Sequence, residues 1–358
     1  MIEPAERPAT RRPGRIGRVA RALTFGLTDT EAAPVALAGF LLRGGVVLLA
    51  LPGIVLPSVI GIAGVTGVDA ISIDGRPTPW LLTLVALAIA VAFVWLAIAS
   101  LVGSLVDIWL IRMASEPRPD KTPRRLELPP GSLLMQLAAI RMTCLLPLAA
   151  ALAWAASRIF NATYAELTTP TNLTSPLPLR VVLAAGDAVA VVAVVWLATE
   201  TIAAIAIRRE VLAGRGFWRS IGGAAAQIVR RPISTFVTVA VSYAASAAAI
   251  GLAMVVTSIA FDWCRIAARN QDPIAIKLGI GDFATVRDFR PVAFSLAAFA
   301  FALAWAAALA LAAVTSAWRS AAFTNEVTDS LSAERESAGE PNVSELGLSG
   351  PTAERSGD

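Results

Sequence analysis

The sequence contains no histidine, only two cysteines, and charged residues at just 16% of its 358 positions. The absence of histidine excludes Ser-His-Asp and Cys-His nucleophile systems, histidine general bases and all histidine-ligated metal sites. Cys144 and Cys264 are too few for a cysteine-rich zinc or iron–sulfur centre. We therefore expect a non-enzymatic protein with no catalytic residues, no metal and no cofactor.

Hydrophobic residues make up 56% of the chain and are grouped in long runs with few charges. A transmembrane helix needs about 20 consecutive apolar residues. Six windows meet this requirement, at residues 44–68, 80–106, 133–157, 181–207, 233–260 and 291–318. The sequence therefore predicts an all-α polytopic membrane protein, with six transmembrane helices arranged as three hairpins and with amphipathic helices on the cytoplasmic side.

The basic residues are divided unevenly among the predicted loops. Residues 1–39, 112–132 and 208–232 hold 17 of the 30 lysines and arginines, whereas the alternate loops hold eight. Cytoplasmic loops carry the excess of positive charge in membrane proteins. We therefore expect both termini in the cytoplasm. Abundant alanine, and arginine in place of lysine, favour the plasma membrane of a GC-rich bacterium.

Three segments follow from this pattern. Residues 1–39 form a basic cytoplasmic segment with an interfacial helix, and residues 40–320 form the six-helix membrane domain. Residues 321–358 are expected to be a disordered acidic cytoplasmic tail. The tail has no aromatic residue after Phe323, and its many acidic, serine, glycine and proline residues cannot bury enough apolar surface to become ordered.

Two segments have the pattern of an amphipathic helix. In residues 15–27 an apolar stripe lies opposite three arginines, which is typical of a helix in the headgroup layer, and residues 215–230 repeat this design. The alternative is a cytosolic helix packed on a partner. The arginines expected to contact anionic headgroups are Arg15, Arg18, Arg21, Arg215, Arg219 and Arg230. The expected partner is the lipid bilayer, with a membrane-protein partner or a homo-oligomer left open, and no nucleic acid is expected.

A few charged residues lie within the predicted membrane helices. Such charges are costly and usually face the bundle interior or water. Arg141 and Glu200 lie about 15 Å and about 12 Å from the cytoplasmic ends of two neighbouring helices, at 1.5 Å per residue. The spacing predicts an Arg141–Glu200 pair, which either holds the hairpin together or forms a gate or ion site; separate snorkelling is the third alternative. Asp187 either lines an outer vestibule or reaches the outer interface, and Asp107 is expected near the cytoplasmic headgroups.

Residues 279–282, Gly-Ile-Gly-Asp, match the GxGD pattern of intramembrane aspartyl proteases. That chemistry needs two carboxylates that share a water and a proton. No Tyr-Asp partner occurs in any predicted span. A glycine-rich turn before the last span explains the four residues better.

Two stretches carry a family resemblance, FLLRGGVVLLALPGIVLPS at 40–58 and YAELTTPTNLTSPLPLR at 164–180. They resemble an uncharacterised family of six-helix multi-pass membrane proteins of GC-rich bacteria. The alternation of interfacial helix and hairpin is also similar to the membrane domains attached to some glycerophosphodiester phosphodiesterases. These resemblances support the topology and imply no activity.

The function that we expect is that of a non-enzymatic membrane scaffold or accessory subunit. The alternative is a transporter or channel component built around Arg141, Glu200 and Asp187. A polar cavity at these residues near the midplane would favour transport, whereas a solid bundle packed through alanine and glycine would favour the scaffold. A membrane enzyme would need two acidic groups within about 6 Å of each other in a water-accessible pocket.

Overall fold

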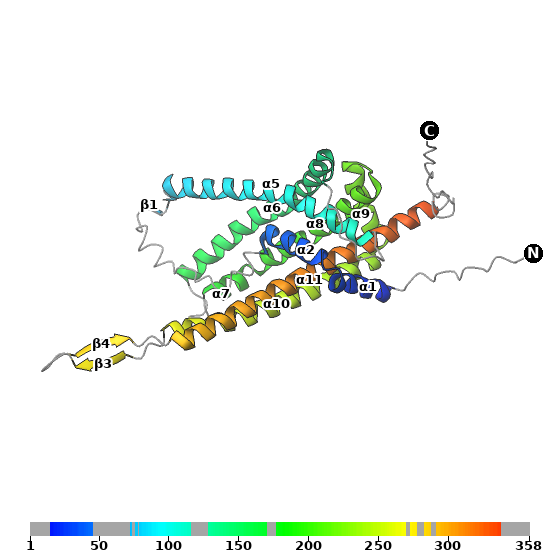
Figure 1. Cartoon of the computed structure of the whole chain (residues 1–358). Coiled ribbons are helices and arrows are strands. Elements are labelled where there is room, and N and C mark those ends of the chain that lie inside the picture. Colours follow the sequence, from blue (N-terminus) through cyan, green and yellow to red (C-terminus); the bar gives the residue numbers. More distant parts are fainter. Residues whose placement is uncertain are drawn as a thin grey trace, which may run out of the picture.

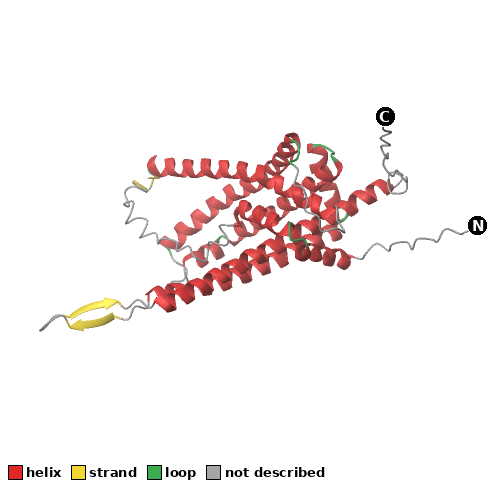
Figure 2. Cartoon of the chain, in the orientation of Figure 1, coloured by secondary structure: helices red, strands yellow, loops and turns green. Residues whose placement is uncertain are grey.

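The structure is a computed structural model with two small strand pairs and otherwise mainly helices (Figure 2). It describes residues 15–45, 72–73, 76–77, 79–115, 128–169, 177–269, 273–277, 283–287 and 291–337. The antiparallel strand pairs are β1 (Ser72–Ile73) with β2 (Arg76–Pro77), and β3 (Pro273–Lys277) with β4 (Phe283–Arg287). The predicted all-α class is confirmed, since these strands only decorate two connections between helices.

Five helices in the described part of the chain are long and apolar enough to cross a membrane. They are α5 (Pro79–Ser115), α6 (Gly131–Thr168), α8 (Gly186–Ala213), α10 (Pro232–Arg269) and α11 (Pro291–Ser337). They coincide with the second to the sixth predicted spans. The first predicted span, 44–68, lies outside the described residues except for Gly44 and Gly45.

The shorter helices are α1 (Arg15–Thr28), α2 (Ala32–Phe40), the π-helical turn η1 (Leu41–Gly45), α7 (Leu177–Ala184) and α9 (Phe217–Arg230). The window predicted as one helix over 181–207 is divided between α7 and α8. Ala185, with φ −106° and ψ 27°, forms the turn between them. Gly186 follows this turn, and glycine is among the weakest helix formers.

Small clusters join α10 to α11 and α6 to α8 along their lengths, but the largest core lies at one end, which we call the packed end. There α5 and α8 finish and α6 and α10 begin, and Figure 1 shows α1, α9 and the last turns of α11 beside them. The strand pairs lie at the opposite end. The main core at the packed end comprises Ile108, Ile111, Leu137, Ile140, Cys144, Ala203, Ile205, Ala206, Ile207, Ala224, Val239, Phe323, Val327 and Leu331.

Away from the packed end the helices carry many exposed apolar side chains. On α5 these include Leu82, Leu87, Val91, Trp95 and Ile98, and on α11 they include Val292, Leu296, Phe299 and Leu303. A bundle in water would not expose such long apolar flanks. The distribution is that expected for helices whose outer surfaces contact lipid tails.

The predicted boundary of the tail is wrong, because α11 continues without a break through residues 321–337. Phe323, Val327 and Leu331 recur every four residues on one helical face and are buried in the main core. The prediction was based on the average composition of residues 321–358, which is polar and does not indicate this short apolar stripe. Residues 338–358 lie outside the described part of the chain.

The amphipathic helix α9 directs its apolar side into the protein. Phe217, Ile221 and Ile228 pack against the main core, and Gln227 is buried as well, whereas Trp218 stays exposed. The expectation that this apolar face lies in the headgroup layer is therefore wrong for most of it. The same amphipathic pattern suits a lipid surface and a protein surface, so sequence alone does not separate the two.

Helix α1 also packs on protein, but through small residues beside its predicted apolar stripe. Ala22 is buried against α11, and a methyl group on Gly26 would meet the backbone oxygen of Val314 at 3.1 Å. Leu23 and Leu27 remain exposed. α1 therefore keeps part of its apolar stripe available for a lipid surface.

Helix α2 packs against both α5 and α11 and leads into the turn η1. A methyl group on Gly39 would meet Cγ1 of Val106 at 2.8 Å, so glycine is needed for this close approach to α5. Gly44, with φ 94°, takes the left-handed conformation that ends η1. Arg43, immediately before it, is thereby placed beside α5.

Candidate functional site

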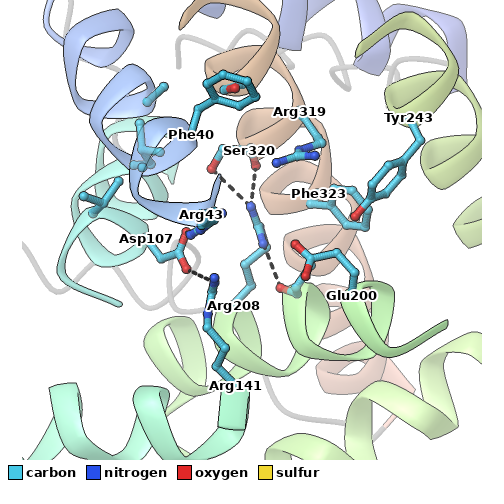
Figure 3. A pocket seen from close by; sticks show the side chains of 16 residues that line it. Phe40, Arg43, Asp107, Arg141, Glu200, Arg208, Tyr243, Arg319, Ser320 and Phe323 are labelled. Carbon is cyan, nitrogen blue, oxygen red and sulfur yellow. Dashed lines mark hydrogen bonds and ion pairs between the residues drawn. The ribbon is translucent and has the colours of Figure 1, made fainter. Parts of the chain in front are cut away.

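A polar cavity of about 40 Å³ lies between α2, α5, α6, α8, α10 and α11 (Figure 3). One water needs about 10–15 Å³ of such space, so the cavity has room for two to four water molecules. Its charged and polar lining consists of Arg43, Asp107, Arg141, Glu200, Arg208, Tyr243, Ser316, Arg319 and Ser320. The two charged residues of the predicted Arg141–Glu200 pair therefore do reach one site.

Asp107 is the bridging carboxylate of this site. Its Oδ1 accepts a short hydrogen bond from Arg43, and its Oδ2 accepts one from Arg141 at 2.5 Å. Asp107 is 5% exposed. Gly103, one turn earlier on α5, faces both guanidinium groups, and a methyl group there would make ordinary contacts, 3.7 Å from Nε of Arg43 and 3.8 Å from Nη1 of Arg141.

The structure therefore corrects two predictions. Asp107, expected near the headgroups, is buried and is the ion-pair partner of Arg141. Glu200, the predicted partner, lines the same cavity, and no ion pair joins it to Arg141 among the described residues. Helical spacing predicts the depth of a side chain, but the rotation of each helix decides which acid faces the arginine.

Arg208 is buried and bonded to neutral oxygens. Its guanidinium donates to the carbonyl of Ala204 at 2.8 Å, to the carbonyl and hydroxyl of Ser320 at 3.2 and 3.1 Å, and to Thr324 Oγ1 at 3.2 Å. It also lies over the ring of Phe323, 5.4 Å from the centroid. Arg208 therefore keeps its charge in the bundle without a carboxylate partner among the described residues.

Arg319 reaches the cavity from α11. Its guanidinium lies 5.3 Å from the centroid of the Tyr243 ring. Tyr243 is held by edge-to-face contacts with Trp196, at a centroid distance of 5.5 Å, and with Phe323, at 6.3 Å. A cation over an aromatic face is stabilised by the ring quadrupole, but its charge is not neutralised.

Asp187 does not belong to this site. It pairs with Arg158 at 2.9 Å, and both side chains are half exposed. It lies in the first turn of α8, whereas Glu200 lies more than three turns further along the same helix. Of the three predicted site residues, the structure brings Arg141 and Glu200 together and leaves Asp187 apart.

Sequence reasoning missed the roles of Arg43, Asp107, Arg208 and Arg319, because each lies near the predicted end of a span. A signal for Asp107 was present. Gly103 and Ser104 lie one turn before Asp107, and Ser100 lies two turns before it, all on the same helical face. Both serines are buried. A polar, small-residue face next to an acid favours burial within a bundle rather than snorkelling.

The arginines expected at lipid headgroups divide into three groups. Arg21, Arg219 and Arg230 are exposed. Arg215 instead pairs with Glu334 of α11 at 2.8 Å. The side chains of Arg15 and Arg18 lie outside what the structure describes, as do residues 278–282, which contain the Asp of the GxGD pattern.

The described residues contain no group of three acidic or cysteine side chains suited to a metal ion. The chain matches no family model, no curated protein and no solved structure. The function must therefore be argued from the cavity itself.

Proposed function

We propose that the protein is a component of a transporter or channel, with the cavity at Arg141 and Glu200 as its polar site. The observation that carries this proposal is the convergence of six charged side chains from η1, α5, α6, α8 and α11 on one small cavity. Buried charge in a membrane bundle is costly and typically marks a substrate or ion pathway.

The depth of the site supports the proposal. Arg141 is ten residues, or about 15 Å, from the first residue of α6, and Glu200 is 13 residues, or about 20 Å, from the last residue of α8. The hydrocarbon core of a bilayer is about 30 Å thick. Side chains at these positions therefore lie well inside the membrane thickness, where transporter sites are usually built.

The proposal includes the membrane placement that the sequence predicts. We place the packed end at the cytoplasmic side of a bacterial plasma membrane, with six spans in three hairpins and both termini in the cytoplasm. The arginine excess of the loops at this end supports the orientation. Arg21, Arg219 and Arg230, which are exposed there, contact anionic headgroups in this arrangement, together with Arg15 and Arg18.

Reconstitution of the full chain into liposomes tests the transport function. Uptake of radiolabelled rubidium, chloride and phosphate would be compared with that of protein-free liposomes. We expect uptake of at least one ion, and a drop of about tenfold in Arg141→Gln, equivalent to about 1.4 kcal/mol. Asp187→Asn, outside the cavity, is the matched control and should leave uptake unchanged. Uptake equal to that of empty liposomes for all three ions would overturn the proposal.

A second candidate is the non-enzymatic scaffold or accessory subunit. It is favoured by the row of exposed apolar residues along α5, a flank that a second membrane protein or another copy of this chain would cover. Blue-native electrophoresis of the protein extracted from its own membrane tests this function. A complex larger than the chain in its detergent micelle supports the scaffold, and a single monomeric species contradicts it.

A further inference from the structure

We propose that the cavity binds a small inorganic oxyanion of the size of phosphate or sulfate. This inference rests on the proposed transport function, because it names the class of substrate for the same site. It is carried by an excess of positive charge around the cavity, including the buried Arg208, that the described carboxylates do not neutralise.

The charges around the cavity do not balance. Four arginines, Arg43, Arg141, Arg208 and Arg319, face two carboxylates, Asp107 and Glu200, which leaves two positive charges in excess. An uncompensated charge buried away from water is strongly unfavourable. A bound anion would remove this imbalance.

The hydrogen bonds of Asp107 go to Arg43 and Arg141 and not, among the described residues, to Arg208 or Arg319. Oδ1 accepts from Arg43 and Oδ2 accepts from Arg141. Arg141 nevertheless keeps a buried Nε that donates to no acceptor among the described residues. Buried donors are nearly always satisfied in proteins, so this one points to a missing acceptor.

Arg208 and Arg319 are held in place by neutral groups. The bonds of Arg208 to Ser320 and Thr324 and the position of Arg319 over Tyr243 orient the two guanidiniums without cancelling their charges. Figure 3 shows both arginines among the side chains that line the cavity. The planar, multi-donor guanidinium matches an oxyanion better than a spherical halide.

The size of the cavity limits the ligand. Its volume of about 40 Å³ has room for two to four waters, which corresponds to an anion of about four or five heavy atoms. A nucleotide or a sugar phosphate would not fit. Glu200 lines the same space and repels any anion there, so it weakens anion binding. Removing its charge should therefore strengthen binding.

Isothermal titration calorimetry on the delipidated full chain in a nonionic detergent tests the inference. Sodium phosphate and sodium sulfate should bind, and sodium chloride should bind much more weakly. We expect Arg208→Gln and Arg319→Gln each to weaken phosphate binding by about 10- to 100-fold, since each removes a charge-assisted contact. Glu200→Gln should tighten it several-fold. Arg112→Gln, at an exposed arginine on α5, is the matched control and should bind as the unmodified protein does.

Each result either supports or overturns the inference. If Arg208→Gln does not fold, Arg319→Gln and the opposite effect of Glu200→Gln still decide. Absence of phosphate and sulfate binding, equal binding of chloride, or unchanged binding in the Arg319 and Glu200 variants would overturn it. Loss of phosphate binding after addition of phosphatidylglycerol would support the same chemistry and identify a lipid headgroup as its source.

The outcome is separable from that of the transport proposal. Uptake of rubidium that depends on Arg141, without binding of phosphate or sulfate, would retain transport and overturn the oxyanion site. Binding of phosphate without uptake of any ion would retain the site and overturn transport.

Discussion

Asp107 holds two arginines, Arg43 and Arg141, from two different helical elements. It is 5% exposed, whereas the side chains of Arg43 and Arg141 are 25% and 12% exposed. A bridging acid of this kind joins η1, α5 and α6. Its removal would leave two guanidinium groups close together with no shared counter-ion.

We expect Asp107→Asn to destabilise the protein by about 3–5 kcal/mol, the usual cost of breaking a buried ion pair by removing one partner. Thermal or denaturant unfolding in detergent, followed by circular dichroism, measures the free energy of unfolding. Asp187→Asn is the control, since the half-exposed pair with Arg158 should contribute little to stability. Equal effects of the two substitutions would contradict the bridging role.

Gly223 is a second residue on which the packing depends, because its lack of a side chain leaves space for a neighbour. A methyl group there would lie 2.7 Å from Nε of Arg209, which is 1% exposed. Arg209 donates to Gln227 at 3.0 Å and to both oxygens of Glu334, at 2.6 and 2.8 Å. The bare surface of α9 at Gly223 therefore lets Arg209 pass from α8 to α11.

We expect Gly223→Ala to cost about 1–3 kcal/mol, because it displaces a buried arginine that is bonded to Gln227 and Glu334. The adjacent Gly222→Ala is the matched control. A methyl group at Gly222 would meet no atom within 4 Å, so this substitution should stabilise α9 by up to about 1 kcal/mol. The melting temperatures of the two variants should shift in opposite directions, and a shift in the same direction would disprove the packing argument.

At the scale of elements, α11 and α9 form the packed end together with the end of α8. The last turns of α11 leave the predicted membrane span and pack on α8 and α9 through Phe323, Val327 and Leu331. Glu334 then accepts from Arg209 and Arg215. This extension is a structural part of the fold rather than the start of a flexible tail.

We expect Leu331→Ala to destabilise the protein by about 2–5 kcal/mol, as large-to-small changes in a packed core do. Leu331 is 6% exposed. Ser332→Ala, at the exposed neighbouring position, should change the free energy of unfolding by less than about 0.5 kcal/mol. Denaturant titration of both variants checks this. An unchanged free energy of unfolding in Leu331→Ala would show that residues 321–337 do not contribute to the core.

At the scale of the whole molecule, the described helices have their largest core at one end and expose apolar flanks along much of their length. Figure 1 shows α1, α9 and the end of α11 at the packed end and β3 and β4 at the other. The two ends of the molecule should therefore lie on opposite sides of the membrane.

Labelling with a membrane-impermeant maleimide in intact bacterial cells checks this arrangement. In a Cys144→Ser, Cys264→Ser background, Thr285→Cys on β4 should be labelled without lysis, and Arg219→Cys on α9 only after lysis. The reasons are the position of the two residues at opposite ends and the arginine excess of the packed end. The reverse pattern would invert the orientation, and labelling of both in intact cells would contradict it altogether.

Much of the fold could be predicted because membrane insertion depends on local composition. The windows at 80–106, 133–157, 233–260 and 291–318 all coincide with long helices. Three features could not be predicted, because they depend on contacts with other elements: the exact ends of the helices, the break at Ala185 and the extension of α11. For the site, depth along the helix correctly brought Arg141 and Glu200 to one cavity. It did not identify the ion-pair partner of Arg141.

The sequence by itself determined that long apolar helices form, because in lipid a run of about 20 apolar residues satisfies its backbone hydrogen bonds as a helix. It also indicated that Arg141 and Glu200 lie within such runs. Only the tertiary structure decided which of these charges meet, since the rotation of α5, α6 and α8 sets whether Asp107 or Glu200 faces Arg141. Likewise, the apolar face of α9 is complementary to lipid and to protein alike, and only the presence of α6, α8 and α10 beside it directs that face into the core.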